Sequence, residues 1–373
     1  MKNKCMALCA ASLCAASAHA QSVVSVYGLL DSGVTYTNRV SVVGGGRSGQ
    51  WSVQPGAMQG SRFGLRGSED LGNGMKSVFV LEGGINVDTG TAAQGGLPWG
   101  RRAVVGLEAP WGTVLFGRQP DFLDDMGVMT SVIDFGSQVS AIHGLDRTGT
   151  QRTNNAVRFN SAPWGPVRVS AIYGLGENAG NSSAGNAAGL GAQYTQGDFR
   201  LAAAYYESRL GTGGAATAAD VGFASLGATA GNPGDVALRT HTVAATYQWD
   251  KTRWHASYGV SEQPLAVAGA ARSIRSASNN RTAVWDVGFS HALTPVWHLS
   301  ASVIHDRVQF VGAASGSLTQ YNLGMDYFLS KRTDVYANLG YQSSSNMNTA
   351  GLEQAPGGTA SQTLVRVGIR HKF

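Results

Sequence analysis

The chain has 373 residues, of which 51 are glycine and 10 are proline, with 14% charged and 9% aromatic side chains and a formal net charge of +5. This charge excess is small and the basic residues do not run together, which argues against binding of nucleic acid. Abundant glycine with regularly placed aromatics argues against disorder and suits many strands joined by sharp turns.

Residues 1–20 have the pattern of a cleaved secretory signal peptide. Lys2 and Lys4 precede an apolar run over 5–17, and the stretch 18–20 (AHA) supplies a small-x-small cleavage pattern. The apolar run is about 13 residues long, too short for a membrane-spanning helix. We therefore expect an exported mature chain, residues 21–373. All three cysteines lie in the removed segment, so the mature chain has no disulfides. Removal of Lys2 and Lys4 leaves 26 basic and 23 acidic residues, a net charge of +3.

Alternation of apolar and polar residues with period 2 recurs along the mature chain. It is clear over 253–260, 284–290, 320–329, 335–342 and 365–373. In the last of these, Val365, Val367, Ile369 and Phe373 share one face and Arg366, Arg370 and Lys372 the other. We count about 16 such segments of roughly ten residues, the length with which a tilted strand crosses a bilayer.

The connections alternate in length. Short links are expected at 69–74, 109–112, 162–165, 196–198, 250–252, 294–296 and 331–333, and long loops rich in Gly, Ser, Ala and Asn at 38–58, 86–98, 178–187, 211–238, 264–281 and 345–361. This order predicts an up-and-down meander with all short turns at one end. The last strand must then pair with the first, over 23–32, to leave no free sheet edge.

Aromatic side chains cluster beside the short turns, as in an interfacial girdle: Trp111, Trp164, Trp249, Trp254, Trp297 and Tyr327. A β-sandwich also buries tryptophan, but its water-facing side should be dense in charged residues, which are sparse here. The predicted fold class is therefore all-β, a transmembrane antiparallel β-barrel of about 16 strands forming a single domain over 21–373.

Four stretches together resemble one family: SVYGLLDSGVTY (25–36), 61–86, 101–119 and the closing VRVGIRHKF (365–373). They are similar to the Gram-negative general porins, particularly the trimeric type common in β-proteobacteria. The resemblance implies a homotrimer in the outer membrane, in contact with lipid and lipopolysaccharide, that forms a water-filled channel for passive diffusion of small hydrophilic solutes and ions. It also implies that Phe373 is a signal read by the barrel-assembly machinery.

The resemblance implies that the third long loop, from about Pro120 to Gln151, folds into the barrel and narrows it. Its apolar content suits packing against the inner wall: Phe122, Leu123, Met126, Val128, Met129, Val132, Ile133 and Phe135. Its acids are expected to face the opening: Asp121, Asp124, Asp125 and Asp134. Many porin loops carry a Pro-Glu-Phe-Gly tetrad where this chain has residues 133–136 (IDFG), which leaves the tip, and the acids that face the lumen, undetermined.

Opposite the loop we predict a basic wall formed by Arg62, Arg66, Lys76, Arg102 and Arg118, with Glu82 and Asp31 as further lumen residues. Arginines facing loop carboxylates would set up a transverse field across a gap comparable to the Debye length of about 8 Å. Alternatively, the arginines only pair with the loop acids and hold the loop in place. The preference between anions and cations, the physiological solute and the pore radius stay open at this level.

Other classes of function find less support in the sequence. A substrate-selective channel of the same fold is the nearest alternative. A barrel enzyme would need a nucleophile, a His and an acid in register, and no such order stands out, so we expect no enzyme. We also expect no cofactor and no metal site; His291, His298 and His305 are seven residues apart and lie on different faces, which argues against a shared metal ion. An adhesion or receptor role for the long loops is unsupported because these loops are poor in aromatics.

Overall fold

The computed structural model describes residues 23–144, 146–149, 151–211, 231–269, 272–349, 351–352 and 359–373. The predicted signal peptide, residues 1–20, lies outside the described residues. None of the helices in the described ranges is long and apolar enough to cross a membrane.

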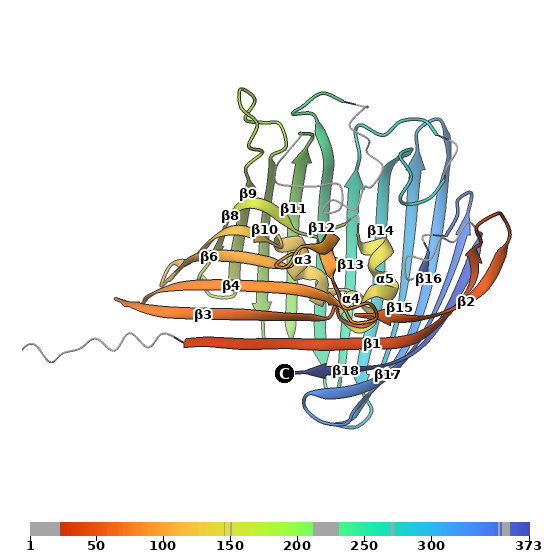
Figure 1. Ribbon diagram of the computed structural model, residues 1–373, viewed down its shortest axis with the longest axis horizontal. Helices are drawn as coiled ribbons and strands as arrows, with labels where there is room; N and C mark the ends of the chain where they lie inside the picture. Colours follow the sequence, from red (N-terminus) through yellow and green to blue (C-terminus); the bar gives the residue numbers. More distant parts are fainter. Residues whose placement is uncertain are drawn as a thin grey trace, which may run out of the picture.

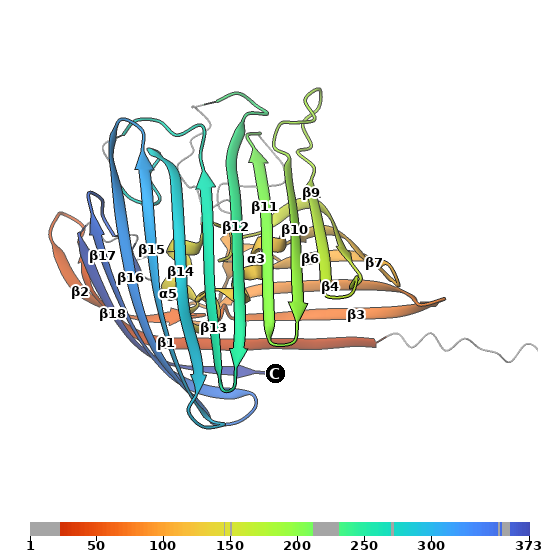
Figure 2. The same ribbon diagram turned by 180° about the vertical axis from the view of Figure 1, so that it is seen from behind.

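The described chain winds into one barrel of antiparallel strands (Figure 1), seen from behind in Figure 2. The strands are β1 (Val23–Ser41), β2 (Arg47–Pro55), β3 (Arg62–Gly72), β4 (Met75–Asn86), β5 (Thr91–Ala92), β6 (Arg102–Ala109), β7 (Gly112–Gln119), β8 (Thr153–Ser161), β9 (Val167–Gly174), β10 (Ala187–Gln196), β11 (Phe199–Arg209), β12 (Val236–Trp249), β13 (Thr252–Glu262), β14 (Asn279–Ala292), β15 (Trp297–Phe310), β16 (Ala313–Phe328), β17 (Thr333–Ser345) and β18 (Ser361–Lys372). The wall has 16 strands, because β2 and β3 line up as one interrupted strand against β1 and the two-residue β5 lies to the side of β4. The predicted fold class is confirmed.

The barrel closes through β1 and β18. Residues Leu29–Thr37 pair with Leu364–Lys372, so the expected partner, 23–32, is only partly right: Phe373 already lies opposite Gly28, and Val23–Leu29 pair with β3 along the other edge of β1. Beyond the last strand, the backbone N–H of Phe373 donates to the carbonyl of Gly28 at 3.0 Å. A Cβ at Gly28 would lie 2.5 Å from the ring of Phe373, so only glycine lets this ring lie over β1.

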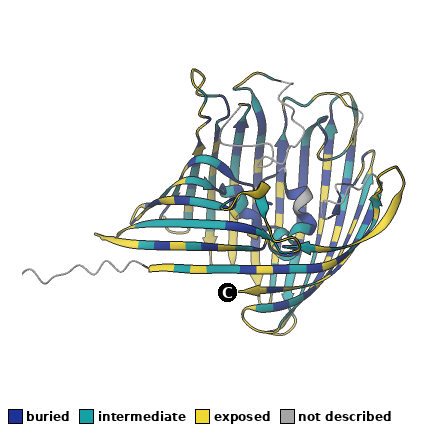
Figure 3. Ribbon diagram, viewed as in Figure 1, coloured by how far each residue is buried: buried dark blue, intermediate teal, exposed yellow. Residues whose placement is uncertain are grey.

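Side chains alternate between an exposed outer face and a buried inner face, as the bands in Figure 3 show. On β18, Val367 is 62% exposed and Ile369 50%, whereas Arg366 is 1% exposed. The predicted parity of the last strand is confirmed. This orientation of the strand suits a lipid environment. The reverse orientation would turn its arginines toward the lipid, at a cost of about 2–4 kcal/mol for each arginine near the midplane.

The seven expected short links all connect consecutive strands at one end of the barrel. One expected long loop, 38–58, is wrong: β1 and β2 cover most of it and leave a tight link at 42–46. Glycines 44–46 all have φ between 88° and 102°, which permits this reversal. The link between β15 and β16 is also only two residues, Val311 and Gly312.

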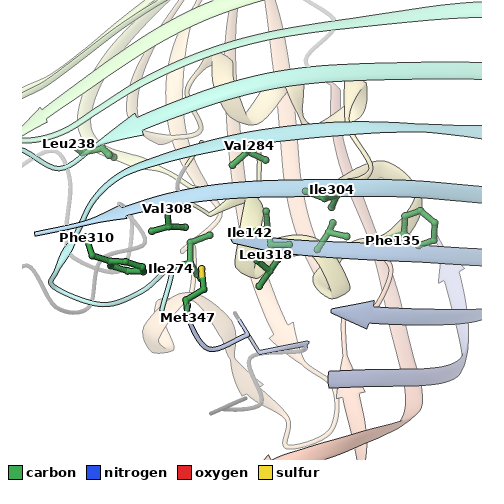
Figure 4. Packing of buried hydrophobic residues seen from close by; sticks show 11 residues of the cluster. Phe135, Ile142, Leu238, Ile274, Val284, Ile304, Val308, Phe310, Leu318 and Met347 are labelled. Carbon is green, nitrogen blue, oxygen red and sulfur yellow. The ribbon is translucent and has the colours of Figure 1, made fainter. Parts of the chain in front are cut away.

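The described residues of the stretch 120–152, here named the inner loop, lie inside the barrel (Figure 1). They form α3 (Phe122–Asp125), the 3₁₀ turn η1 (Met126–Met129), α4 (Val132–Phe135) and α5 (Ser137–His143); outside the inner loop, α2 (Ala93–Gly96) precedes β6. Phe135, Val139 and Ile142 pack on wall residues that include Ile304 and Leu318 (Figure 4). Leu123, Met126 and Met129 pack on the alanines of β8 and β10–β12: Ala156, Ala187, Ala202 and Ala244. The inner loop thus packs against the inner wall, as its apolar content predicted, and small wall residues make room for α3 and η1.

Candidate functional site

A buried ion pair fixes the start of the inner loop. Asp121 caps α3 by accepting from the N–H groups of Leu123 (2.8 Å) and Asp124 (3.2 Å), and Arg147 Nη2 lies 2.6 Å from its other oxygen. The guanidinium of Arg147 stacks 3.8 Å from the ring centre of Tyr206 on the wall. Asp121 is 1% exposed, so the prediction that it faces the opening is wrong. Both oxygens of its carboxylate make contacts within the inner loop, so Asp121 stabilises the shape of the loop.

A second buried cluster ties the end of α5 to the wall. His143 lies between two carboxylates, with Nδ1 2.8 Å from Asp146 and Nε2 3.2 Å from Asp286 of β14. Asp286 also accepts from the N–H of Ser131 at 2.7 Å and contacts His255 of β13 at 3.3 Å. Burial opposes a charge on the His143 ring, but the two carboxylates outweigh it and raise the pKa of His143 to about 10.

The tip of the inner loop rests on a break in the barrel wall. Residues 56–61, between β2 and β3, turn inward, and the N–H of Ser137 donates to the carbonyl of Ala57 at 3.0 Å. Asp31 holds this break: it accepts from the N–H groups of Met58 (3.0 Å) and Gln59 (2.6 Å) and from the hydroxyl of Tyr336 (2.6 Å). Asp31 was predicted as a lumen residue, but it is 1% exposed and acts as a structural anchor.

A cavity of about 570 Å³ remains between the inner loop and the facing wall. The wall side comes from the break at 55–62, from β4 and from β14–β18; the loop side comes from α3 to α5. Seven charged side chains line it: Arg62, Arg101, Asp124, Asp134, Asp326, Arg370 and Lys372. The structure therefore brings three of the predicted site residues, Arg62, Asp124 and Asp134, together on one lining.

Arginines crowd one side of this cavity. Arg101 Nε donates to Glu82 Oε1 at 2.7 Å, and Arg62 lies 3.9 Å from the same carboxylate oxygen. Arg152 is close to both Arg101 and Asp124. Burial together with the neighbouring Arg101 lowers the pKa of Arg152 to about 10. Burial raises the pKa of Asp124, while Arg152 opposes that rise. Glu82 thus acts as a counter-ion to Arg62 and Arg101.

On the other side each acid has a cationic partner. Arg253 Nη2 lies 2.6 Å from Asp134, and burial raises the pKa of Asp134 while Arg253 opposes the rise. Arg370 bridges Asp334 at 3.0 Å and Asp326 at 3.4 Å. Wall arginines therefore pair with acids here, as in the interpretation that they hold the loop in place. The acids Asp134 and Asp326 and the cation Arg370 also line the cavity, as the interpretation of a transverse field requires.

Several predicted wall residues lie elsewhere. Arg66 and Lys76 are near the short turn between β3 and β4 and do not line the cavity; Arg66 Nε donates to Ser25 at 3.1 Å. Arg118 pairs in register with Ala103, its Nε donates to the carbonyl of Gly100 at 2.8 Å, and it does not line the cavity.

Arg102 and Asp125 contribute to a second, smaller cavity of about 310 Å³ between α3 and the wall strands β6–β10. Asp125 pairs with Arg158 there, so the prediction that it faces the constriction is wrong. Arg102 lines this second cavity and not the first one.

Sequence reasoning missed Arg101, Arg152, Arg253 and Arg370 as residues of the constriction region. For Arg253 and Arg370 a signal was present, since both alternate with apolar neighbours in their strands and so face inward. Arg101 and Arg152 precede β6 and β8, where period 2 does not apply. Among the described residues, no group of His, Cys, Asp and Glu is arranged to hold a metal ion.

A barrel with a charged, loop-narrowed lumen and an apolar outer face defines a membrane channel. A family model described as Gram-negative porin matches residues 6–347, and the chain belongs to that family. An outer membrane porin protein of Bordetella pertussis is 27% identical over 96% of each chain, and outer membrane porin protein 32 of Delftia acidovorans is 28% identical over 100% of each. Among solved structures, an anion-selective porin from Comamonas acidovorans has a TM-score of 0.71 at 24% identity, covering 95% of this chain and 100% of that one.

These relatives place the protein in the outer membrane of a Gram-negative bacterium. It is a general porin, a water-filled channel through which small hydrophilic solutes and ions pass passively. The members of this family are channels, and no relative favours the substrate-selective alternative.

Proposed function

We propose that the 570 Å³ cavity is the narrowest part of the conduction path and that it favours anions. The observation that carries the proposal is the balance of charges on its lining: four cations, Arg62, Arg101, Arg370 and Lys372, against the three acids Asp124, Asp134 and Asp326. Burial raises the pKa of both loop acids, which weakens the negative side further. The description of the Comamonas acidovorans porin as anion-selective supports the same sign.

The double variant Arg62→Gln/Arg101→Gln tests this assignment. It removes two of the four lining cations and leaves Glu82 without its arginine partners, so the balance of lining charge changes from positive to negative. The reversal potential in a KCl gradient is expected to change sign, from anion to cation preference. The measurement is made on single channels in a planar bilayer.

The control is Arg66→Gln/Lys76→Gln, which removes the same amount of charge from β3 and β4 near the short-turn end. This variant should keep the sign of the wild-type reversal potential. Equal shifts in both double variants would show that selectivity follows overall lumen charge, and the assignment to this cavity would be wrong.

We further propose that the working unit is a homotrimer and that Phe373, paired with Gly28 beside the closing strands, serves as the assembly signal. Support for the trimer comes from the family resemblance. Support for the signal comes from the position of Phe373 next to the junction of β1 and β18, where the barrel closes last.

A further inference from the structure

The second cavity, of about 310 Å³, shares no lining residue with the 570 Å³ cavity of the constriction. The short helix α3 contributes to both: Asp124 lines the first cavity, whereas Phe122 and Asp125 line the second. The second cavity is open to the lumen, since the side chain of Asp125 is 44% exposed. Its volume is at the lower end of the range of about 300–1,000 Å³ that is usual for sites of small molecules.

One arginine of this cavity is fixed in place. Arg158 of β8 is 5% exposed, and its Nε donates to Asn160 at 3.0 Å and to Ser170 at 3.2 Å. Its Nη1 donates to the carbonyl of Pro120 at 2.8 Å, and its Nη2 pairs with Asp125. The wall and the inner loop thus hold this guanidinium in one position, and Asp125 balances its charge.

Two further arginines line the cavity without such partners. Arg102 on β6 and Arg168 on β9 have no salt bridge and no hydrogen bond within the described part of the chain. Three arginines against one aspartate leave the described lining with an excess of two positive charges. Guanidinium groups that lack a protein acceptor at the edge of a cavity are suited to bind an anionic group of a ligand.

The two unpaired arginines lie on opposite sides of Arg158. Strand register places Arg102 four residues along β6 from the level of Arg158, toward the long loops. It places Arg168 four residues along β9 from that level, toward the short turns. At about 3.3 Å per residue, each of these steps is roughly 13 Å along the strands. Arg102 and Arg168 are therefore too far apart to hold one small anion together.

The lining between the two unpaired arginines has an apolar part. Leu115 of β7 pairs in register with Arg158, so it lies midway between them along the strands. Phe122 of α3 adds an aromatic ring, and a side chain at Gly191 would collide with this ring, so the glycine lets it lie against β10. The order of cation, apolar part and cation matches a molecule with an anionic group at each end and a hydrocarbon chain between.

We propose that the second cavity binds aliphatic dicarboxylates, with one carboxylate on Arg102, the other on Arg168 and the chain on Leu115 and Phe122. Guanidinium groups bind carboxylates in a bidentate manner. Inorganic sulfate or phosphate fits less well, because a single small anion reaches only one of the two arginines and makes no use of the apolar part. Binding should be weak, since a ligand of a passive channel has to leave again. The inference rests on the open channel and not on the anion preference proposed for the 570 Å³ cavity.

The test is calorimetric titration of the folded protein in neutral detergent with suberate, a dicarboxylate with an unbranched chain, at low ionic strength. The wild type should bind suberate at least about fivefold more tightly than octanoate, which lacks one carboxylate, and than succinate, whose chain is shorter. The variant Arg102→Gln/Arg168→Gln should bind suberate at least about tenfold more weakly. Arg66→Gln/Lys76→Gln removes the same amount of charge from residues that line neither cavity, and it should stay within about twofold of the wild type.

Equal suberate binding by these two double variants would overturn the proposal, as would equal affinity of the wild type for suberate and sulfate. The variant Arg62→Gln/Arg101→Gln should keep the wild-type affinity for suberate. If it lost that affinity while Arg102→Gln/Arg168→Gln kept it, the dicarboxylate would bind in the 570 Å³ cavity and the proposal would be wrong. Because the readout is affinity and not reversal potential, failure of this proposal is distinguishable from failure of the one for the constriction.

Discussion

Replacing Asp286 with alanine is expected to destabilise the protein by about 3–5 kcal/mol, because it breaks a buried ion pair and leaves the buried His143 with one carboxylate, that of Asp146, in place of two. Asp286 is fully buried and contacts His143 and the N–H of Ser131, both in the inner loop, as well as His255 on the wall. Without it, the inner loop keeps its apolar contacts but loses its charged attachment to β14. A less firmly attached inner loop should narrow the lumen less and fluctuate more, so we also expect larger and noisier single-channel currents.

Urea unfolding of the refolded protein measures the stability change. The matched control is Asp306→Asn, which changes an equally buried aspartate on the neighbouring strand whose carboxylate oxygens have no hydrogen-bond partner within the described ranges. This control should unfold at or above the wild-type midpoint. An Asp286→Ala midpoint no lower than that of Asp306→Asn would contradict the role given to the cluster.

The same cluster predicts a dependence on pH. The pKa of His143 is raised from 6.5 to about 10, so its pairing with Asp146 and Asp286 stabilises the fold fully below pH 6.5. That contribution is lost progressively as the pH rises from 6.5 through 10. The urea midpoint of the wild type should fall over this range, and a His143→Gln variant should show a flatter profile. An identical slope in both proteins would assign the pH dependence to other groups.

Replacing Asp31 with alanine is the second change expected to have a large effect. It leaves the N–H groups of Met58 and Gln59 and the hydroxyl of Tyr336 without their charged acceptor. Hydrogen bonds to a charged group contribute about 1.5–3 kcal/mol each, so we expect a loss of about 3 kcal/mol or more. Because the carbonyl of Ala57 receives the N–H of Ser137, the tip of the inner loop should loosen as well.

Thermal unfolding of the refolded protein checks this expectation. Asp31→Asn keeps the shape and part of the accepting capacity, so its loss should be smaller, and Asp250→Ala in an exposed short turn should have little effect. If Asp31→Ala unfolds at the same temperature as Asp250→Ala, the break at 56–61 is held by other contacts.

The barrel could be predicted because period 2 is a local property of each strand. The pattern of 365–373 identifies its lipid face without any knowledge of its neighbours, and the exposed Val367 and buried Arg366 confirm it. The stretch 38–58 was predicted wrongly because that prediction also used only local information. Its glycines and serines are typical of a loop, but pairing with β1 makes 47–55 a strand, β2. Tertiary pairing here overrides local composition.

The site was harder to predict, because alternation fixes the face of a strand but not the height along the barrel. Arg62 and Arg66 are both on the inner face of β3, yet only Arg62 lines the cavity. Within the loop, Asp121, Asp124 and Asp125 fall on one short helix that turns each to a different side, so that only Asp124 lines this cavity. The partners that decide these roles, such as Arg147 and Arg158, become visible only in three dimensions.

The open, anion-favouring pore is tested most directly by single-channel recording of the folded wild-type protein in a planar bilayer, followed by measurement of its reversal potential in a KCl gradient. We expect stepwise, ohmic openings and a reversal potential of the sign that marks anion preference. A folded protein without conductance would contradict the open pore. Openings with cation preference would leave the channel in place and contradict the assignment of Arg62 and Arg101 as the groups that set its selectivity.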